Sequence, residues 1–175
     1  MGHRPIMVMG PGRCGSSSVA RILHTRLGVA MGTSFAPADR HNPGGYYEDL
    51  DFVFPNKFFL DGRLTYPEWR KMVLPALDSR TGPWGFKDPR LAYLGGLYFG
   101  FCRWRVVRVC RELSAVVASM QRCYGWDEKE ATIETRQRER HIDNLVRDLG
   151  KDDLCWLRMN NEPDERIVEQ LEQWL

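Results

Sequence analysis

The sequence predicts an α/β fold, a three-layer sandwich in which helices cover both faces of a central parallel sheet. Short apolar runs typical of buried strands alternate with stretches whose apolar residues recur at helical spacing. A glycine-rich loop follows the first apolar run, Ile6–Met9, and a helix is predicted directly after that loop. The length of 175 residues and the apolar fraction of 43% suit a single domain over residues 1–175.

Each element is predicted from its local pattern. Strands are expected where apolar and β-branched residues run together, at residues 6–9, 28–32, 84–87, 104–110 and 154–158. Helices are expected where apolar residues share one face, at residues 16–27, 69–77, 91–101, 113–120, 128–149 and 163–175. The aromatic stretch 52–60 is also expected to be helical, with a break at Pro55, and the segment 33–45 to be a loop.

The loop Gly10–Ser18 has the features of an anion site. Glycines let the backbone approach a ligand closely, and the first N–H groups of a helix have no acceptor within the helix. The helix dipole adds partial positive charge, so the backbone alone can hold a phosphate or sulfate. Arg13 adds a full charge, and Ser16, Ser17 and Ser18 add hydroxyl groups. The alternative interpretation is an ordinary glycine turn before a helix.

The loop differs from that of nucleoside triphosphatases, in which a lysine follows the second glycine. Gly10 and Gly15 have the spacing of that loop, but Ser16 occupies the lysine position and the cation comes earlier, at Arg13. The segment Arg-Cys-Gly-Ser-Ser at 13–17 resembles the 5′-phosphosulfate loop of sulfotransferases. This resemblance implies a P-loop-containing nucleoside triphosphate hydrolase-like fold. It also implies that the donor substrate is 3′-phosphoadenosine 5′-phosphosulfate, bound by Gly12, Arg13, Cys14, Gly15, Ser16, Ser17 and Ser18.

Other segments extend the resemblance. Arg111 follows the strand predicted at 104–110, and Ser119 follows Arg111 at the spacing with which sulfotransferases bind the 3′-phosphate of their donor. Segment 84–90 resembles one found in bacterial members of the family, and segment 42–48 resembles the stretch that carries the acceptor-side carboxylate. Residues 154–175 resemble the closing strand and helix of the family, although Asn160-Asn161-Glu162 replaces the usual Glu-Asp-Leu.

The implied reaction transfers a sulfuryl group in line to an acceptor hydroxyl or amine, without a metal ion. Glu48 is our candidate general base, and Lys87 and Arg13 are candidates for stabilising charge on the leaving phosphate. Asp88, Asp49 and His41 are alternative bases. The acceptor stays open, since a sugar, a lipid head group, a small alcohol or a peptidyl tyrosine would all need the same groups.

Several of these residues also have structural interpretations. Lys87 fits a salt bridge to a neighbouring acid equally well, and Asp88 fits a cap on the helix that follows it. Arg111 and Ser119 fit a surface arginine and a helix serine. Cys14 fits a small loop residue better than a thiol of low pKa.

The composition of the chain limits which kinds of partner we expect. The net charge of +2 is low for a general nucleic-acid binder. The five cysteines include no Cys-x-x-Cys pair, which argues against a metal site and favours reduced thiols. The sequence contains no apolar run long enough to span a membrane. We therefore expect a cytoplasmic protein whose partners are a nucleotide donor and a hydroxyl-bearing acceptor, with no nucleic acid and no membrane.

Two departures from the family pattern keep alternatives open. The chain ends at Leu175, so we expect the C-terminal loop that closes over the 3′-phosphate in many members to be absent. Ser18-Val19 stand where an adenine-stacking aromatic residue often follows the hydroxyl pair. Three hypotheses follow: an active sulfotransferase, a phosphotransferase (kinase) built on a related loop, and a non-catalytic binder of adenosine 3′,5′-bisphosphate.

Overall fold

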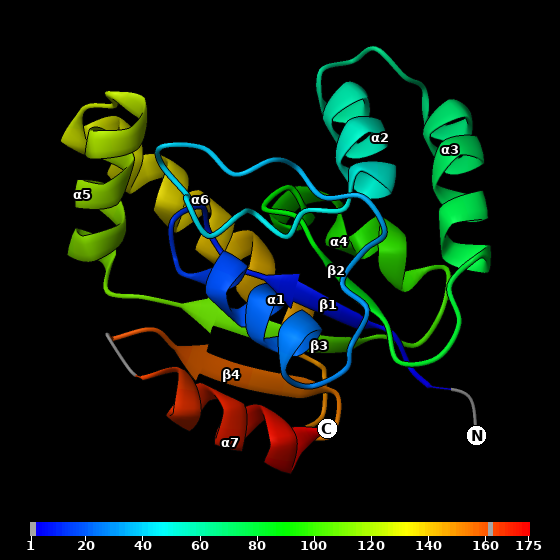
Figure 1. Cartoon of the computed structure of the whole chain (residues 1–175). Coiled ribbons are helices and arrows are strands. Elements are labelled where there is room, and N and C mark those ends of the chain that lie inside the picture. Colours follow the sequence, from blue (N-terminus) through cyan, green and yellow to red (C-terminus); the bar gives the residue numbers. More distant parts are fainter. Residues whose placement is uncertain (1–2, 161–162) are drawn as a thin grey trace.

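The computed structural model describes residues 3–160 and 163–175 of the chain (Figure 1). Within these residues, four strands form one parallel sheet in the order β2-β1-β3-β4: β1 (Ile6–Met9), β2 (Gly85–Lys87), β3 (Arg105–Cys110) and β4 (Leu154–Arg158). The helices are α1 (Ser16–Thr25), α2 (Leu50–Leu60), α3 (Tyr66–Asp78), α4 (Leu91–Phe99), α5 (Leu113–Tyr124), α6 (Glu128–Val146) and α7 (Asp164–Trp174). The predicted α/β fold with a central parallel sheet is confirmed.

The central strand β1 sets the register of the sheet. It pairs in parallel with β2 on one side and β3 on the other, so that Val8 lies opposite both Lys87 and Val107. β3 carries the sheet on to β4, with Val107 opposite Cys155. Because the four strands point in one direction, their carboxyl ends meet at the same edge, where ligands of such sheets bind.

Helices cover both faces of the sheet, since successive residues of a strand point to opposite faces. On one face, Val8 and Val109 belong to an apolar core formed with α1 and α7. On the opposite face, Met7 and Val106 belong to a second core formed with α4 and α6, which lie behind the sheet in Figure 1. Burial on both sides explains why β1 is apolar throughout rather than alternating.

The strand expected at 28–32 does not form. Gly28 turns the chain with a φ of 68°, and only Ala30 reaches the sheet, through an isolated parallel bridge to Trp84. The other predicted strands are present. Among the described residues, no helix is both long enough and apolar enough to cross a membrane.

Two parts of the chain stand above the sheet in Figure 1. The antiparallel pair α2 and α3 stands at one end, and α5 stands at the other. A long loop over residues 33–49 runs from α1 toward α5 and returns to α2. Pro55 lies inside α2 without ending the helix, which departs from the predicted break at that residue.

Gly10, which follows β1, can be tested as a packing constraint. A Cβ at this position would lie 2.5 Å from Cys14 Sγ and 2.7 Å from the carbonyl oxygen of Val109. We expect Gly10→Ala to lower the free energy of unfolding by about 1–3 kcal/mol because the core is overpacked there. Gly44, whose Cβ would meet nothing within 4 Å, supplies the control Gly44→Ala. Equal urea denaturation midpoints for the two variants would contradict this constraint.

Candidate functional site

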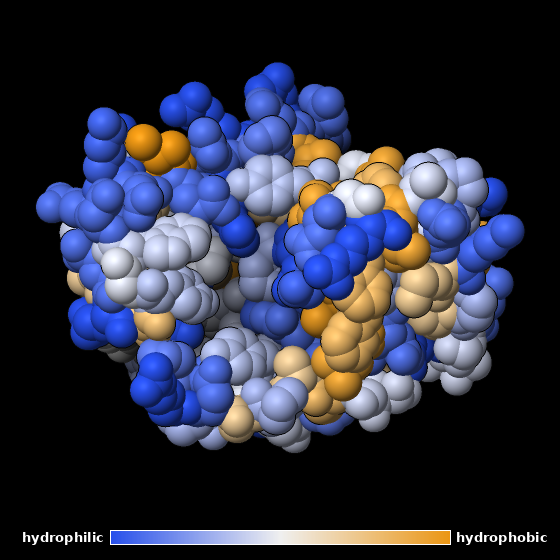
Figure 2. Space-filling model, turned by 90° about the horizontal axis from the view of Figure 1, so that it is seen from above, coloured by the Kyte–Doolittle hydropathy of each residue, from blue (hydrophilic) through white to orange (hydrophobic). Residues whose placement is uncertain are grey.

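A polar cavity of about 170 Å³ lies at the carboxyl edge of β1, β2 and β3. The face seen in Figure 2 is hollowed near its centre, between polar side chains and an apolar band. The cavity is lined by Gly12, Arg13, Gly15, Ser16, Ser17, Ser18, Asn42, Tyr46, Glu48, Lys87, Pro89, Arg111, Ser119 and Tyr124. All of the predicted site residues line it except Cys14, so one cavity gathers groups from five separate segments.

The glycine loop lines this cavity directly before helix α1. Gly15 has a φ of 98°, and α1 begins at Ser16 directly after it. The Gly15 carbonyl accepts from the amides of Ser18 and Val19. The positive end of the helix dipole lies at this loop, and it favours an anion there.

Among the described residues, two that are not glycine have a left-handed backbone conformation, and both flank the cavity. Arg13 has a φ of 67° and Tyr47 a φ of 51°. Such conformations are strained and persist where surrounding contacts hold them, often at functional sites. Here they turn the chain at the loop that carries the first cation and immediately before Glu48.

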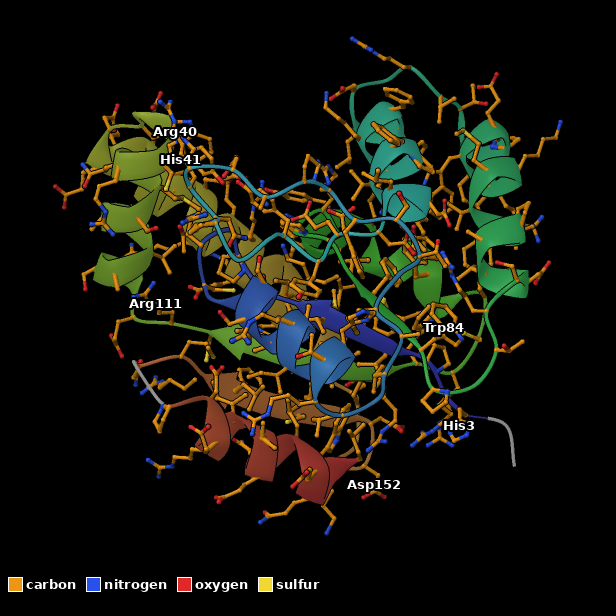
Figure 3. All side chains as sticks on the ribbon, viewed as in Figure 1. His3, Arg40, His41, Trp84, Arg111 and Asp152 are labelled. Atoms are coloured by element: carbon orange, nitrogen blue, oxygen red, sulfur yellow. The ribbon has the colours of Figure 1, made fainter. Side chains whose placement is uncertain are left out.

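Arg13 connects three segments around the cavity. Its Nε donates to Ser119 Oγ at 3.1 Å, and its NH2 donates to the carbonyl oxygen of His41 at 3.0 Å. The guanidinium therefore bridges the glycine loop, helix α5 and the 33–49 loop. Figure 3 shows His41 and Arg111 on the same side of the molecule, beyond the end of β3.

Lys87 and Glu48 form a buried ion pair on the opposite wall. Lys87 Nζ lies 2.5 Å from Glu48 Oε1 and 3.3 Å from Ser17 Oγ. Only 3% of Lys87 and 9% of Glu48 are exposed. The pairing of Val8 with Lys87 sets this geometry, because it places the end of β2 beside the glycine loop. The salt bridge expected as one interpretation of Lys87 is present, and the lysine also contacts the glycine loop through Ser17.

Asp88 has a structural role. Its Oδ1 accepts from the Arg90 backbone amide at 2.9 Å and from Arg90 NH1 at 2.8 Å, while Oδ2 accepts from Asn56 Nδ2 at 2.9 Å. Both carboxylate oxygens are therefore occupied, in a side chain that is fully buried. The predicted cap is only partly right: Asp88 bonds the amide of Arg90, the residue before α4, and not an amide within the helix.

Asn56 joins the α2–α3 pair to the site. Its Oδ1 accepts from Trp69 Nε1 at 2.9 Å and from the Tyr98 hydroxyl at 2.8 Å, in addition to its bond to Asp88. Burial raises the pKa of Tyr98 well above its ordinary value. No role was predicted for Asn56 from the sequence. A lone amide inside the aromatic stretch 52–60 is nevertheless a usable signal, because a buried amide needs partners.

The alternative bases are engaged elsewhere. Asp49 caps α2 through the amide of Asp51 and binds Arg80 at 2.6 Å. Burial raises the pKa of Asp49, an effect that Arg80 partly opposes. His41 Nε2 accepts from Arg40 Nε at 3.0 Å, on the loop labelled in Figure 3. Among these candidate bases, Glu48 is thus the carboxylate that lines the cavity together with the glycine loop.

The rim of the cavity is organised by Asp39. This carboxylate accepts from the Tyr46 hydroxyl at 2.8 Å and from the amides of His41 and Asn42. Burial, followed by the hydrogen bond to Asp39, raises the pKa of Tyr46 to about 12. The hydroxyl stays protonated at neutral pH, and its bond to Asp39 holds the Tyr46 ring at the cavity wall.

Cys14 departs from the other predicted residues. Its side chain is fully buried in the core behind the loop, and burial raises the pKa of the thiol. Only its backbone can face a ligand, so the interpretation as a small loop residue fits. In the part of the chain that the structure describes, no group of three or more His, Cys, Asp and Glu residues could hold a metal ion.

The chain matches no protein-family model and no curated protein sequence. Its fold matches several solved structures. A sulfotransferase domain from the curacin biosynthetic pathway superposes with a TM-score of 0.60 at 14% identity, over 98% of this chain and 73% of that one. Shikimate kinase from Bacteroides thetaiotaomicron superposes with a TM-score of 0.58 at 11% identity, over 97% and 96%. TT1252 from Thermus thermophilus superposes with a TM-score of 0.58 at 15% identity, over 98% of this chain and 95% of that one.

These structures establish the fold. At such identities they show an α/β architecture of the P-loop type, which sulfotransferases and P-loop kinases share. The predicted P-loop-like fold is therefore confirmed.

The Asn56 connection predicts a large loss of stability. Asn56→Ala leaves the Trp69 ring N–H, the Tyr98 hydroxyl and one Asp88 oxygen without their partner, so we expect the free energy of unfolding to fall by about 3 kcal/mol. The control Tyr98→Phe removes one hydroxyl from the same group and is expected to cost about 1 kcal/mol. Urea denaturation measures both losses, and similar values for the two variants would show that the amide does not join these elements.

Proposed function

We propose that this protein transfers a sulfuryl group from 3′-phosphoadenosine 5′-phosphosulfate to the hydroxyl or amine of an acceptor. One observation carries the proposal. A single cavity contains a glycine loop whose cation is Arg13, the Arg111 and Ser119 pair, and the Glu48–Lys87 pair. A donor with anionic groups on the 3′ and 5′ positions of its ribose needs two separate anion sites, which we assign to the glycine loop and to the Arg111 and Ser119 pair.

The two ends of the cavity differ in a way that suits this donor. The glycine loop, with its helix amides, suits the 5′-phosphosulfate. Arg111 lines the cavity and has no ion pair with any residue that the structure describes, so its guanidinium is available for the 3′-phosphate. Ser119 is buried and its Oγ already accepts from Arg13, which connects the two ends of the proposed donor site.

The residues have distinct roles in this proposal. The acceptor oxygen or nitrogen forms a bond to sulfur while the bond from sulfur to the bridging phosphate oxygen breaks, and the acceptor proton goes to Glu48. Charge on the phosphate is balanced by Lys87, Arg13 and the helix amides. Holding the reacting groups in line supplies the rest of the acceleration.

A phosphotransferase is the second candidate. Lys87 Nζ lies 3.3 Å from Ser17 Oγ, so a lysine does reach the loop, although it comes from β2 instead of the loop itself. A deoxyadenosine kinase from M. mycoides, solved with bound dATP, also shares the fold, with a TM-score of 0.55 at 14% identity. A non-catalytic nucleotide binder would keep the cavity and lose turnover.

Ligand choice separates the first and third candidates from the second. We expect adenosine 3′,5′-bisphosphate to bind more tightly than ATP with magnesium in calorimetric titrations. Arg111→Ala should weaken the bisphosphate about tenfold or more and leave adenosine 5′-monophosphate, which has no 3′-phosphate, nearly unchanged. Tighter binding of ATP would favour the phosphotransferase. So would an Arg111→Ala variant that loses the same affinity for the bisphosphate and for the monophosphate.

Turnover tests the base. With labelled donor and a panel of sugars, lipids, alcohols and tyrosyl peptides, we expect Glu48→Gln to reduce kcat by about 100-fold or more while nucleotide binding persists. Glu112→Gln is the matched control, because it removes an exposed carboxylate that pairs with Arg158 and leaves the Glu48–Lys87 ion pair unchanged. Normal turnover by Glu48→Gln would exclude this residue as the base.

A further inference from the structure

The proposed base and the proposed charge-stabilising lysine are bound to each other. Glu48 Oε1 accepts from Lys87 Nζ at 2.5 Å, inside a wall that leaves both residues almost fully buried. The lone pair of Oε1 that faces the ammonium is occupied, so it cannot also accept a hydrogen bond from the hydroxyl of an incoming acceptor. In this arrangement the lysine competes with the acceptor for Oε1.

Lys87 lies between Glu48 and the anion loop. Its ammonium is 3.3 Å from Ser17 Oγ, and the same cavity is lined by the loop from Gly12 to Ser18. An anion on the loop amides would therefore lie within reach of the ammonium. The lysine stem is flexible and its charge is compact, so Nζ can turn between two anions without movement of the β2 backbone, which β1 holds.

Glu48 keeps a second cation when the lysine turns away. Arg90 NH1 lies 4.0 Å from Glu48 Oε2. That guanidinium is fixed by its 2.8 Å bond to Asp88, which is itself held by Asn56. The contact of Arg90 is with Oε2, whereas the lysine occupies Oε1. Departure of the lysine would thus free one oxygen of a carboxylate that stays in place.

We propose that Lys87 is exchanged between Glu48 and the anionic donor, so that donor binding frees the base. This inference rests on the roles of Glu48 and Lys87 in the proposed function. Glu48 and the donor compete for one ammonium, which makes the ion pair an autoinhibitory contact. The donor must bind first, and the acceptor hydroxyl then meets a free Oε1.

Competition predicts that removing the Glu48 carboxylate strengthens anion binding. Calorimetric titration with adenosine 3′,5′-bisphosphate, and separately with inorganic pyrophosphate, should show Glu48→Gln binding about tenfold more tightly than the original protein, since the lysine no longer has to leave a carboxylate. Lys87→Met should bind about tenfold more weakly. In the Lys87→Met background, adding Glu48→Gln should change the affinity less than about twofold, because there is no ammonium to compete for.

A matched control separates competition from a general change of charge. Glu112→Gln removes one carboxylate near the cavity, where its side chain is 63% exposed, and does not contact Lys87. We expect it to change either affinity less than about twofold. Thermal unfolding of each variant, measured by circular dichroism, confirms that the titrated proteins are folded.

The outcomes separate this inference from the proposed function. Unchanged or weaker binding by Glu48→Gln would overturn the exchange, as would a gain that persists in Lys87→Met or appears equally in Glu112→Gln. If pyrophosphate binds but the bisphosphate does not, the proposed donor is wrong, while the pyrophosphate titrations still decide the exchange. If neither anion binds the original protein, both proposals fail.

Discussion

The parallel pairing of β1 between β2 and β3 is the constraint on which the rest of this structure depends. It brings the ends of three strands to one edge, and with them the glycine loop, Lys87 and Arg111. Register matters as much as direction. Val8 and Lys87 are opposite each other and point to the same face, where α1 begins. A slip of one residue would turn Lys87 to the other face and remove it from the anion loop.

The Lys87–Glu48 pair lines the cavity, and further buried charge pairs lie among apolar residues next to it. A buried charge without a partner costs several kcal/mol, and each one here has a partner. Lys87 binds Glu48, Asp88 binds Arg90 and Asn56, and Asp49 binds Arg80. These pairs join the sheet, the 33–49 loop and the α2–α3 pair, so the cavity is held by contacts between distant segments. Its shape is a property of the whole domain.

Local patterns were enough to predict most of the elements and the position of the glycine loop. The run Ile6–Met9, the glycines after it and the helix beginning at Ser16 are read directly from neighbouring residues, because strand burial and helix initiation are short-range effects. The pattern failed at 28–32, where apolar residues next to Gly28 give a single bridge to Trp84 and no strand. The strand propensity of these residues does not show that the chain meets the edge of the sheet only at Ala30.

The sequence by itself determined the fold class and most of the residues that line the cavity, through the glycine loop after the first strand and through the resemblance to sulfotransferases. Only the tertiary structure decided what those residues do to one another. It placed Lys87 against Glu48, Arg13 between Ser119 and the 33–49 loop, and Asn56 under Asp88. It also turned the Cys14 side chain into the core. These contacts join residues far apart in the chain, and no local pattern encodes which distant partner will satisfy a buried charge or amide.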